Sequence, residues 1–95
     1  MAQVDPATRN DVDHLLERAL AAWNGLADVE CEIDAWDLED QIAFVEEWPH
    51  EEERLERLAG LVKAGALDAD QQTRYTRLLT LVERNRPVVD RLLRA

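Results

Sequence analysis

The stretch from residue 63 to residue 71, Lys63-Ala64-Gly65-Ala66-Leu67-Asp68-Ala69-Asp70-Gln71, decides the fold. Gly65 suits the position after the last turn of a helix, because glycine enters the left-handed region without steric cost. Asp68 is a good N-cap, and Gln71 stands three residues later, as in a capping box. The stretch therefore predicts the end of one helix, a tight turn and the start of another. Helices joined by so short a loop pack antiparallel, so we expect a helical hairpin at about 50–86.

A first helix is predicted upstream, from Pro6 or Asn10 to Asn24. Its apolar residues recur at spacings of three and four, as on one face of a helix. They are Val12, Leu15, Leu16, Ala19, Leu20 and Trp23. Pro6 suits a first helical turn, and Gly25 suits a left-handed residue after the last one.

The second helical region, from about Asp28, carries two competing apolar stripes. One consists of Val29, Ile33 and Trp36, and the other of Cys31, Ala35, Leu38, Ile42 and Val45. Two explanations fit this pattern. Either one wide apolar face contacts two neighbours, or the helix breaks near Asp37.

Two prolines interrupt the later helical patterns. Pro49 lacks a backbone N–H, and its ring clashes with the carbonyl of Val45, so it kinks or ends a helix. Apolar spacing continues across Pro49, which favours a kinked or closely restarted helix over a long loop. Pro87 interrupts the last helical region in the same way. The sequence thus predicts an all-α fold, a small bundle of three to five helices, in a single acidic domain spanning 1–95.

Composition narrows the class of protein. Hydrophobic residues make up 46% and charged residues 34%, which is typical of a folded, soluble chain. No apolar run approaches the length of a membrane span, and the N-terminus does not resemble a signal peptide. Cys31 is the single cysteine; it fits a reducing cytoplasm, and we expect it to be a small buried hydrophobe. Ten of the eleven basic residues are arginine and only Lys63 is lysine, which indicates a prokaryote with a GC-rich genome.

Charge is sorted along the chain. Residues 28–56 contain thirteen acids and one base, whereas residues 57–95 contain eight bases and four acids. The net charge is −10, which argues against nucleic acid as a partner, since phosphate binding needs a basic surface. An acidic belt (residues 28–56) beside a basic C-terminal region predicts self-association, most simply as a homodimer, or docking on a basic protein.

Five residues are candidates for that interface. Trp36 and Trp48 lie in the acidic belt, where each is either a core residue or an interface anchor. Arg77, Arg84 and Arg91 recur every seven residues and could face the acidic belt of a second subunit. Trp23, outside the belt, is expected in the core.

Two acidic patterns have spacings found among metal ligands. Glu47 and His50 have the Glu-x-x-His spacing that four-helix carboxylate sites use twice, but Pro49 lies between them and no second set is evident. Glu30, Asp34, Asp37 and Gln41 would share a helical face, as magnesium ligands do in all-α pyrophosphohydrolases, without the paired acidic motifs of that class. We therefore expect no metal and no cofactor, with Glu47 and His50 as the candidates if a metal is found.

The segment from Arg9 to His14, Arg-Asn-Asp-Val-Asp-His, resembles the ribonuclease motif of HEPN domains, which are also all-helical. The resemblance covers six residues and implies a nuclease using Arg9 and His14. The motif lies beside three acids that would repel RNA.

The preferred function is a non-enzymatic interaction module that acts as a homo-oligomer. The first alternative is an inhibitor or antitoxin-like protein that covers a basic partner. The second is an enzyme, either a helical metal-dependent hydrolase or a HEPN-like ribonuclease.

Overall fold

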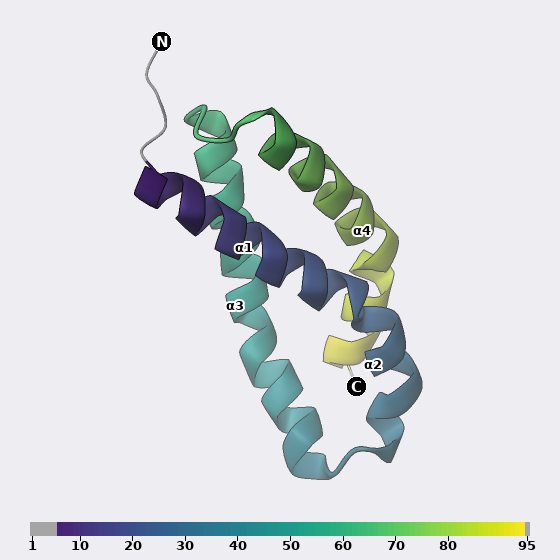
Figure 1. Ribbon diagram of the computed structural model, residues 1–95. Coiled ribbons are helices and arrows are strands. Elements are labelled where there is room, and N and C mark those ends of the chain that lie inside the picture. Colours follow the sequence, from purple (N-terminus) through teal and green to yellow (C-terminus); the bar gives the residue numbers. More distant parts are fainter. Residues whose placement is uncertain (1–5, 95) are drawn as a thin grey trace.

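The computed structural model describes residues 6–94, and these residues form helices without any strand. The elements in chain order are α1 (Pro6–Asn24), α2 (Leu26–Glu32), the short 3-10 helix η1 (Ile33–Ala35), α3 (Leu38–Lys63) and α4 (Ala69–Arg94) (Figure 1). The predicted all-α class is confirmed, and the first helix has the predicted bounds. No helix within residues 6–94 combines the length and apolarity that crossing a membrane requires.

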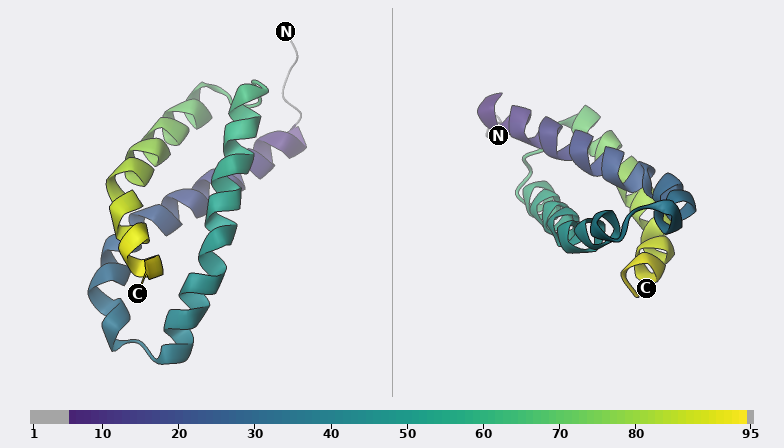
Figure 2. Two further views of the ribbon diagram at one scale, coloured as in Figure 1. Left: turned by 180° about the vertical axis from the view of Figure 1, so that it is seen from behind. Right: turned by 90° about the horizontal axis from the view of Figure 1, so that it is seen from below.

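Helices α3 and α4 both extend to the same side of the turn at 64–68 with opposite chain directions, and α1 lies across the angle between them (Figures 1 and 2). α1 contacts α3 and α4 more extensively than these two contact each other. The predicted hairpin is therefore splayed, and its helices extend beyond the expected 50–86. It opens because α1 inserts its buried face, formed by Val12, Leu16, Ala19 and Trp23.

The turn between α3 and α4 has the predicted chemistry at both ends. Gly65 has a φ of 73°, and Ala66 N–H donates to Leu61 O at 3.0 Å, which closes a Schellman motif. Asp68 and Gln71 form a reciprocal capping box. The backbone N–H of Gln71 donates to Asp68 Oδ1 at 2.8 Å, and the backbone N–H of Asp68 donates to Gln71 Oε1 at 3.0 Å.

Replacing Gly65 by alanine is expected to destabilise the protein by about 1–2 kcal/mol, since an L-residue in left-handed backbone conformation carries that cost. A Cβ at this position would meet no atom within 4 Å, so the effect isolates backbone strain. Urea unfolding of Gly65→Ala measures it. Gly60→Ala is the matched control, because Gly60 lies inside α3 and its Cβ would also meet nothing within 4 Å. An equal loss of stability in both variants would contradict this account of the turn.

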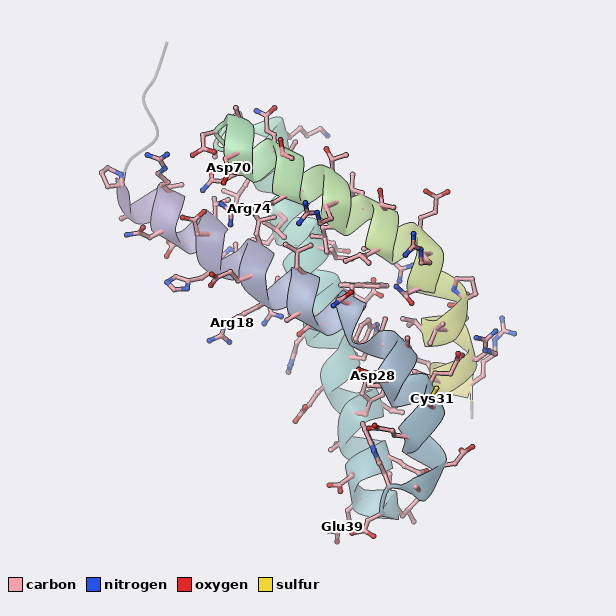
Figure 3. All side chains as sticks on the ribbon, turned by 45° about the vertical axis from the view of Figure 1, so that its right-hand side comes forward. Arg18, Asp28, Cys31, Glu39, Asp70 and Arg74 are labelled. Atoms are coloured by element: carbon pink, nitrogen blue, oxygen red, sulfur yellow. The ribbon has the colours of Figure 1, made fainter. Side chains whose placement is uncertain are left out.

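The capping box also ties α4 to α1. Gln71 is only 1% exposed, and its Nε2 donates to Asp13 Oδ1 at 2.8 Å and to Arg9 O at 3.1 Å. Arg74, which lies against α1 in Figure 3, donates to the same Asp13 oxygen at 2.6 Å. Arg9 pairs with Asp68 at 2.9 Å. One network thus joins the start of α4 to the first turns of α1.

Hydrogen bonds from Gln71 and then from Arg74 hold the pKa of the Asp13 carboxyl below its ordinary value of 3.8. The folded state therefore binds this proton less readily than the unfolded state does. The resulting stabilisation is present above the unfolded pKa and is lost as pH falls through the folded one.

We expect Asp13→Asn to lower the free energy of unfolding at neutral pH. The difference from the wild type should shrink as pH falls through the native pKa of Asp13. A difference independent of pH would contradict the role of the ionised carboxylate.

The core lies where α1, α3 and α4 cross. Its buried apolar residues are Val12, Leu16, Ala19, Trp23, Leu26, Trp48, Leu58, Leu67, Leu78, Val89 and Leu92. The Trp23 and Trp48 rings meet edge to face with centroids 5.0 Å apart. The Arg86 guanidinium stacks 4.9 Å from the Trp23 ring and pairs with Glu52, which also accepts a hydrogen bond from Trp48 Nε1. Side chains of three helices are thereby joined at one point.

Both prolines lie inside continuous helices: Pro49 in α3 and Pro87 in α4. Neither proline ends its helix, and a kink is consistent with the bent helix α4. Figure 1 shows α4 changing direction in its last third, where Pro87 lies. The bend turns the end of α4 toward α2, which α4 contacts.

Two local expectations are wrong. Gly25 has φ −80° and ψ −6°, in the right-handed region, because the chain passes almost directly from α1 into α2. Cys31 is exposed rather than buried (Figure 3). Leu26 is buried and Val29 is packed against the core, so the inward face of α2 follows their spacing and Cys31 lies off it.

Candidate functional site

The two competing apolar stripes have different fates. Ile33 and Val29 pack against the core, and Trp36 is half-buried. The members of the other stripe, Cys31, Ala35, Leu38, Ile42 and Val45, are all exposed. The helical region breaks at Trp36, whose backbone is extended (φ −76°, ψ 152°), so the predicted break near Asp37 is present. Leu38, Ile42 and Val45 follow the break and lie on α3. A row of large apolar side chains is therefore left without cover.

This row forms one wall of a groove of about 570 Å³ bounded by α2, η1, the first half of α3 and the end of α4. Leu38 is 70% exposed, Ile42 47% and Val45 37%. Ile33 and Leu92 supply apolar surface from the other elements. The first half of α3 runs past the end of α4 (Figure 2), which leaves this face of α3 open.

Acidic side chains line the groove alongside the apolar ones. Glu30, Asp34 and Glu46 are its three acids, and Arg91 is its one base. Arg91 is ion-paired with Glu30 across the α2–α4 contact. The groove therefore presents an apolar surface with unbalanced negative charge at its edges.

Gln41 fixes the end of the groove where the chain turns back. Its Nε2 donates to Ile33 O, in the first residue of η1, at 2.9 Å and to Trp36 O, just after η1, at 3.0 Å. Trp36 packs edge to face on Phe44 with ring centroids 6.3 Å apart. These contacts hold η1 against α3, so the groove is pre-formed in the single chain.

The five candidate interface residues are distributed unevenly. Trp48 is 4% exposed in the core, so the core interpretation holds for it and it offers no surface to a partner. Trp36 is half-buried beside the groove. Arg91 lies in the groove lining, where its acidic partner comes from the same chain. Arg77 and Arg84 are exposed and form no ion pair within residues 6–94.

The acidic candidates do not converge on a metal centre in the part of the chain that the structure describes. Glu47 and His50 are both exposed on α3, one turn apart. Among residues 6–94, no group of three or more His, Cys, Asp or Glu side chains could hold a metal ion. The expected shared face of Glu30, Asp34, Asp37 and Gln41 is wrong, because the break at Trp36 divides them between separate elements.

Arg9 and His14, the pair in the HEPN-like motif, contact different parts of the protein. Arg9 is bound to Asp68 at the start of α4. His14 instead lines a hollow between α1 and α3, together with Arg18, Arg54 and Arg57. The sequence motif therefore does not bring Arg9 and His14 into one site.

Comparison of the chain with protein-family models, with curated proteins and with solved structures finds no match. The groove is the candidate site on its own geometry: an exposed apolar row, a fixed end and an acidic lining. The sequence did not name Leu38, Ile42 and Val45 as functional residues. In the sequence these three residues are recognisable only as members of the second apolar stripe, and in the structure they are left exposed.

Proposed function

We propose that the protein is an interaction module whose groove binds an amphipathic helix of a basic partner protein. The apolar face of that helix would lie on Leu38, Ile42 and Val45, and its basic residues would lie beside Glu30, Asp34 and Glu46. The uncovered apolar row of α3 is the observation that carries this proposal. An inhibitor of a basic protein would use the same surface in the same way.

Burial of the row supplies the binding energy. Leu38 and Ile42 expose about half of their surface or more, and fully burying such a side chain contributes about 1.5–3 kcal/mol. Leu38, Ile42 and Val45 are spaced by four and three residues on one helix, which matches the i, i+3, i+4 spacing of apolar residues on a docking helix. The pre-formed end at Gln41 limits the ordering cost.

Charge selects the kind of helix. Three acids and one already paired base line the groove, and the surrounding residues 28–56 contain thirteen acids. A helix with lysine or arginine beside its apolar face is attracted to this surface, whereas an acidic helix is repelled. Electrostatic complementarity also speeds encounter, so association should slow as salt screens the charges.

A second copy of the chain would compete for the groove, because symmetric packing of α3 against α3 would also cover Leu38, Ile42 and Val45 in both chains. Such a homodimer brings two acidic belts together, and each chain has a net charge of −10. Like charges at that contact oppose it. Light scattering at micromolar concentration separates the two: a basic-partner module stays at 10.9 kDa alone, whereas a homodimer has twice that mass.

The experiment for the proposed function is a titration with three synthetic peptides of equal length. The first is an amphipathic helix with leucine on one face and lysine on the other. The second has the same composition in scrambled order, and the third has glutamate in place of lysine. We expect saturable binding in the micromolar range for the first peptide alone. Equal binding of the scrambled peptide would show that net charge, and not the groove, attracts the helix.

A further inference from the structure

A second concave site lies away from the groove, between α1 and the second half of α3. It is a hollow of about 280 Å³. Its lining consists of Asp11, His14, Leu15, Arg18, Arg54 and Arg57. The α1 residues recur at spacings of three, one and three and so share one helical face, and the two α3 arginines are one turn apart. Three guanidinium groups and an imidazole thus gather in a chain whose net charge is −10.

The hollow has an excess of positive charge, unlike other arginine sites between elements. Arginines that bridge elements elsewhere are matched by acids: Arg9 by Asp68, Arg74 by Asp13, Arg86 by Glu52 and Arg91 by Glu30. Within residues 6–94, the side chains of Arg18 and Arg57 form no ion pair or hydrogen bond, although the chain contains 21 acids and 11 Lys and Arg residues. Asp11 is the one acid in the lining.

Arg54 is held in place by Glu51. Its Nη1 donates to both carboxylate oxygens of Glu51, at 2.5 and 2.6 Å, on the same helix. An arginine has five N–H donors, so the other nitrogens of Arg54 retain theirs. Arg18, which projects from α1 in Figure 3, and Arg57 bring further donors from both sides of the hollow.

We propose that this hollow binds a small phosphate-type anion, such as inorganic phosphate, pyrophosphate or a phosphate monoester. Guanidinium groups match the oxygens of a phosphate bidentately, and an anion relieves the repulsion between neighbouring arginines. Pyrophosphate should bind more tightly than phosphate, because two phosphate groups reach arginines on both helices. This site is independent of the groove, which uses the opposite end of α3.

Calorimetric titration of the full chain at low ionic strength, with inorganic pyrophosphate and with phosphate, tests the site. We expect saturable binding of one pyrophosphate per chain. Arg57→Gln and Arg18→Gln should each weaken binding about tenfold or more, since a charge-assisted hydrogen bond is lost. Asp11→Asn should strengthen it, because the one acid of the lining becomes neutral.

Arg84→Gln is the matched control, since Arg84 is exposed on α4 and the substitution removes the same charge. It should leave pyrophosphate binding within about twofold of the wild type, because Arg84 lies outside the lining of the hollow and offers the ligand no charge-assisted hydrogen bond. Arg18, Arg57 and Arg84 are all exposed, and circular dichroism checks that each variant is folded. Absence of saturable binding, or an Arg84→Gln effect equal to that of Arg57→Gln, would overturn the proposal.

Discussion

Trp23→Ala is expected to destabilise the protein by about 3–5 kcal/mol, the range for removing a large buried aromatic side chain. Trp23 is fully buried and contacts Trp48 of α3 and Arg86 of α4. A chain of this length has a total stability of about 5–14 kcal/mol, so the loss is a large fraction of it. Thermal and urea unfolding measure the effect, and the melting temperature should fall by about 10 °C or more.

Trp23→Phe is the matched variant for this prediction. Trp23 Nε1 is buried without a hydrogen-bond partner within residues 6–94, so phenylalanine gives up no hydrogen bond and retains a ring against Trp48. We expect a much smaller loss of stability than for alanine. A Trp23→Ala variant as stable as the wild type would show that the crossing of α1, α3 and α4 is not the centre of the fold.

Ile42→Asp is expected to abolish binding of the basic amphipathic peptide at concentrations that saturate the wild type. The substitution removes apolar surface from the middle of the exposed row and places a charge where the apolar face of the peptide would lie. Burying an unpaired carboxylate costs several kcal/mol, which corresponds to a loss of affinity of more than about a hundredfold. The fold should persist, since Ile42 is 47% exposed in the single chain.

Leu79→Asp is the control for that variant. Leu79 has the same 47% exposure, lies on α4 outside the groove lining, and gives the same change of charge. Peptide binding should be nearly unchanged. If the two variants weaken binding equally, the effect comes from added negative charge or general loss of apolar surface, and the groove has no special role.

The turn at 64–68 was predictable because its chemistry is local. Gly65, Asp68 and Gln71 satisfy backbone groups within a few residues of themselves, so their spacing carries the information. The first helix was predictable for a similar reason, since one apolar face repeats at helical spacing. The classification as all-α follows from these two observations together.

Other features depend on contacts distant in sequence. The splay of α3 and α4 arises from where α1 inserts, and the reach of Gln71 to Asp13 spans 58 residues. The sequence left two explanations open for the apolar stripes at 29–45. Deciding which stripe is buried requires knowing that the end of α4 lies beside α2. The candidate groove results from that choice. The homodimer predicted from the sequence, the basic partner and the roles of Arg77 and Arg84 stay predictions.

Amide chemical shifts of isotopically labelled protein, recorded during titration with the basic amphipathic peptide, test the central claim most directly. We predict saturable shifts concentrated at residues 30–46 and 91–92, which line or adjoin the groove. Leu79 and its neighbours should not move. Shifts spread evenly over the acidic belt, or largest outside the groove, would show that the peptide follows charge alone and would contradict the assignment of the groove as a docking site.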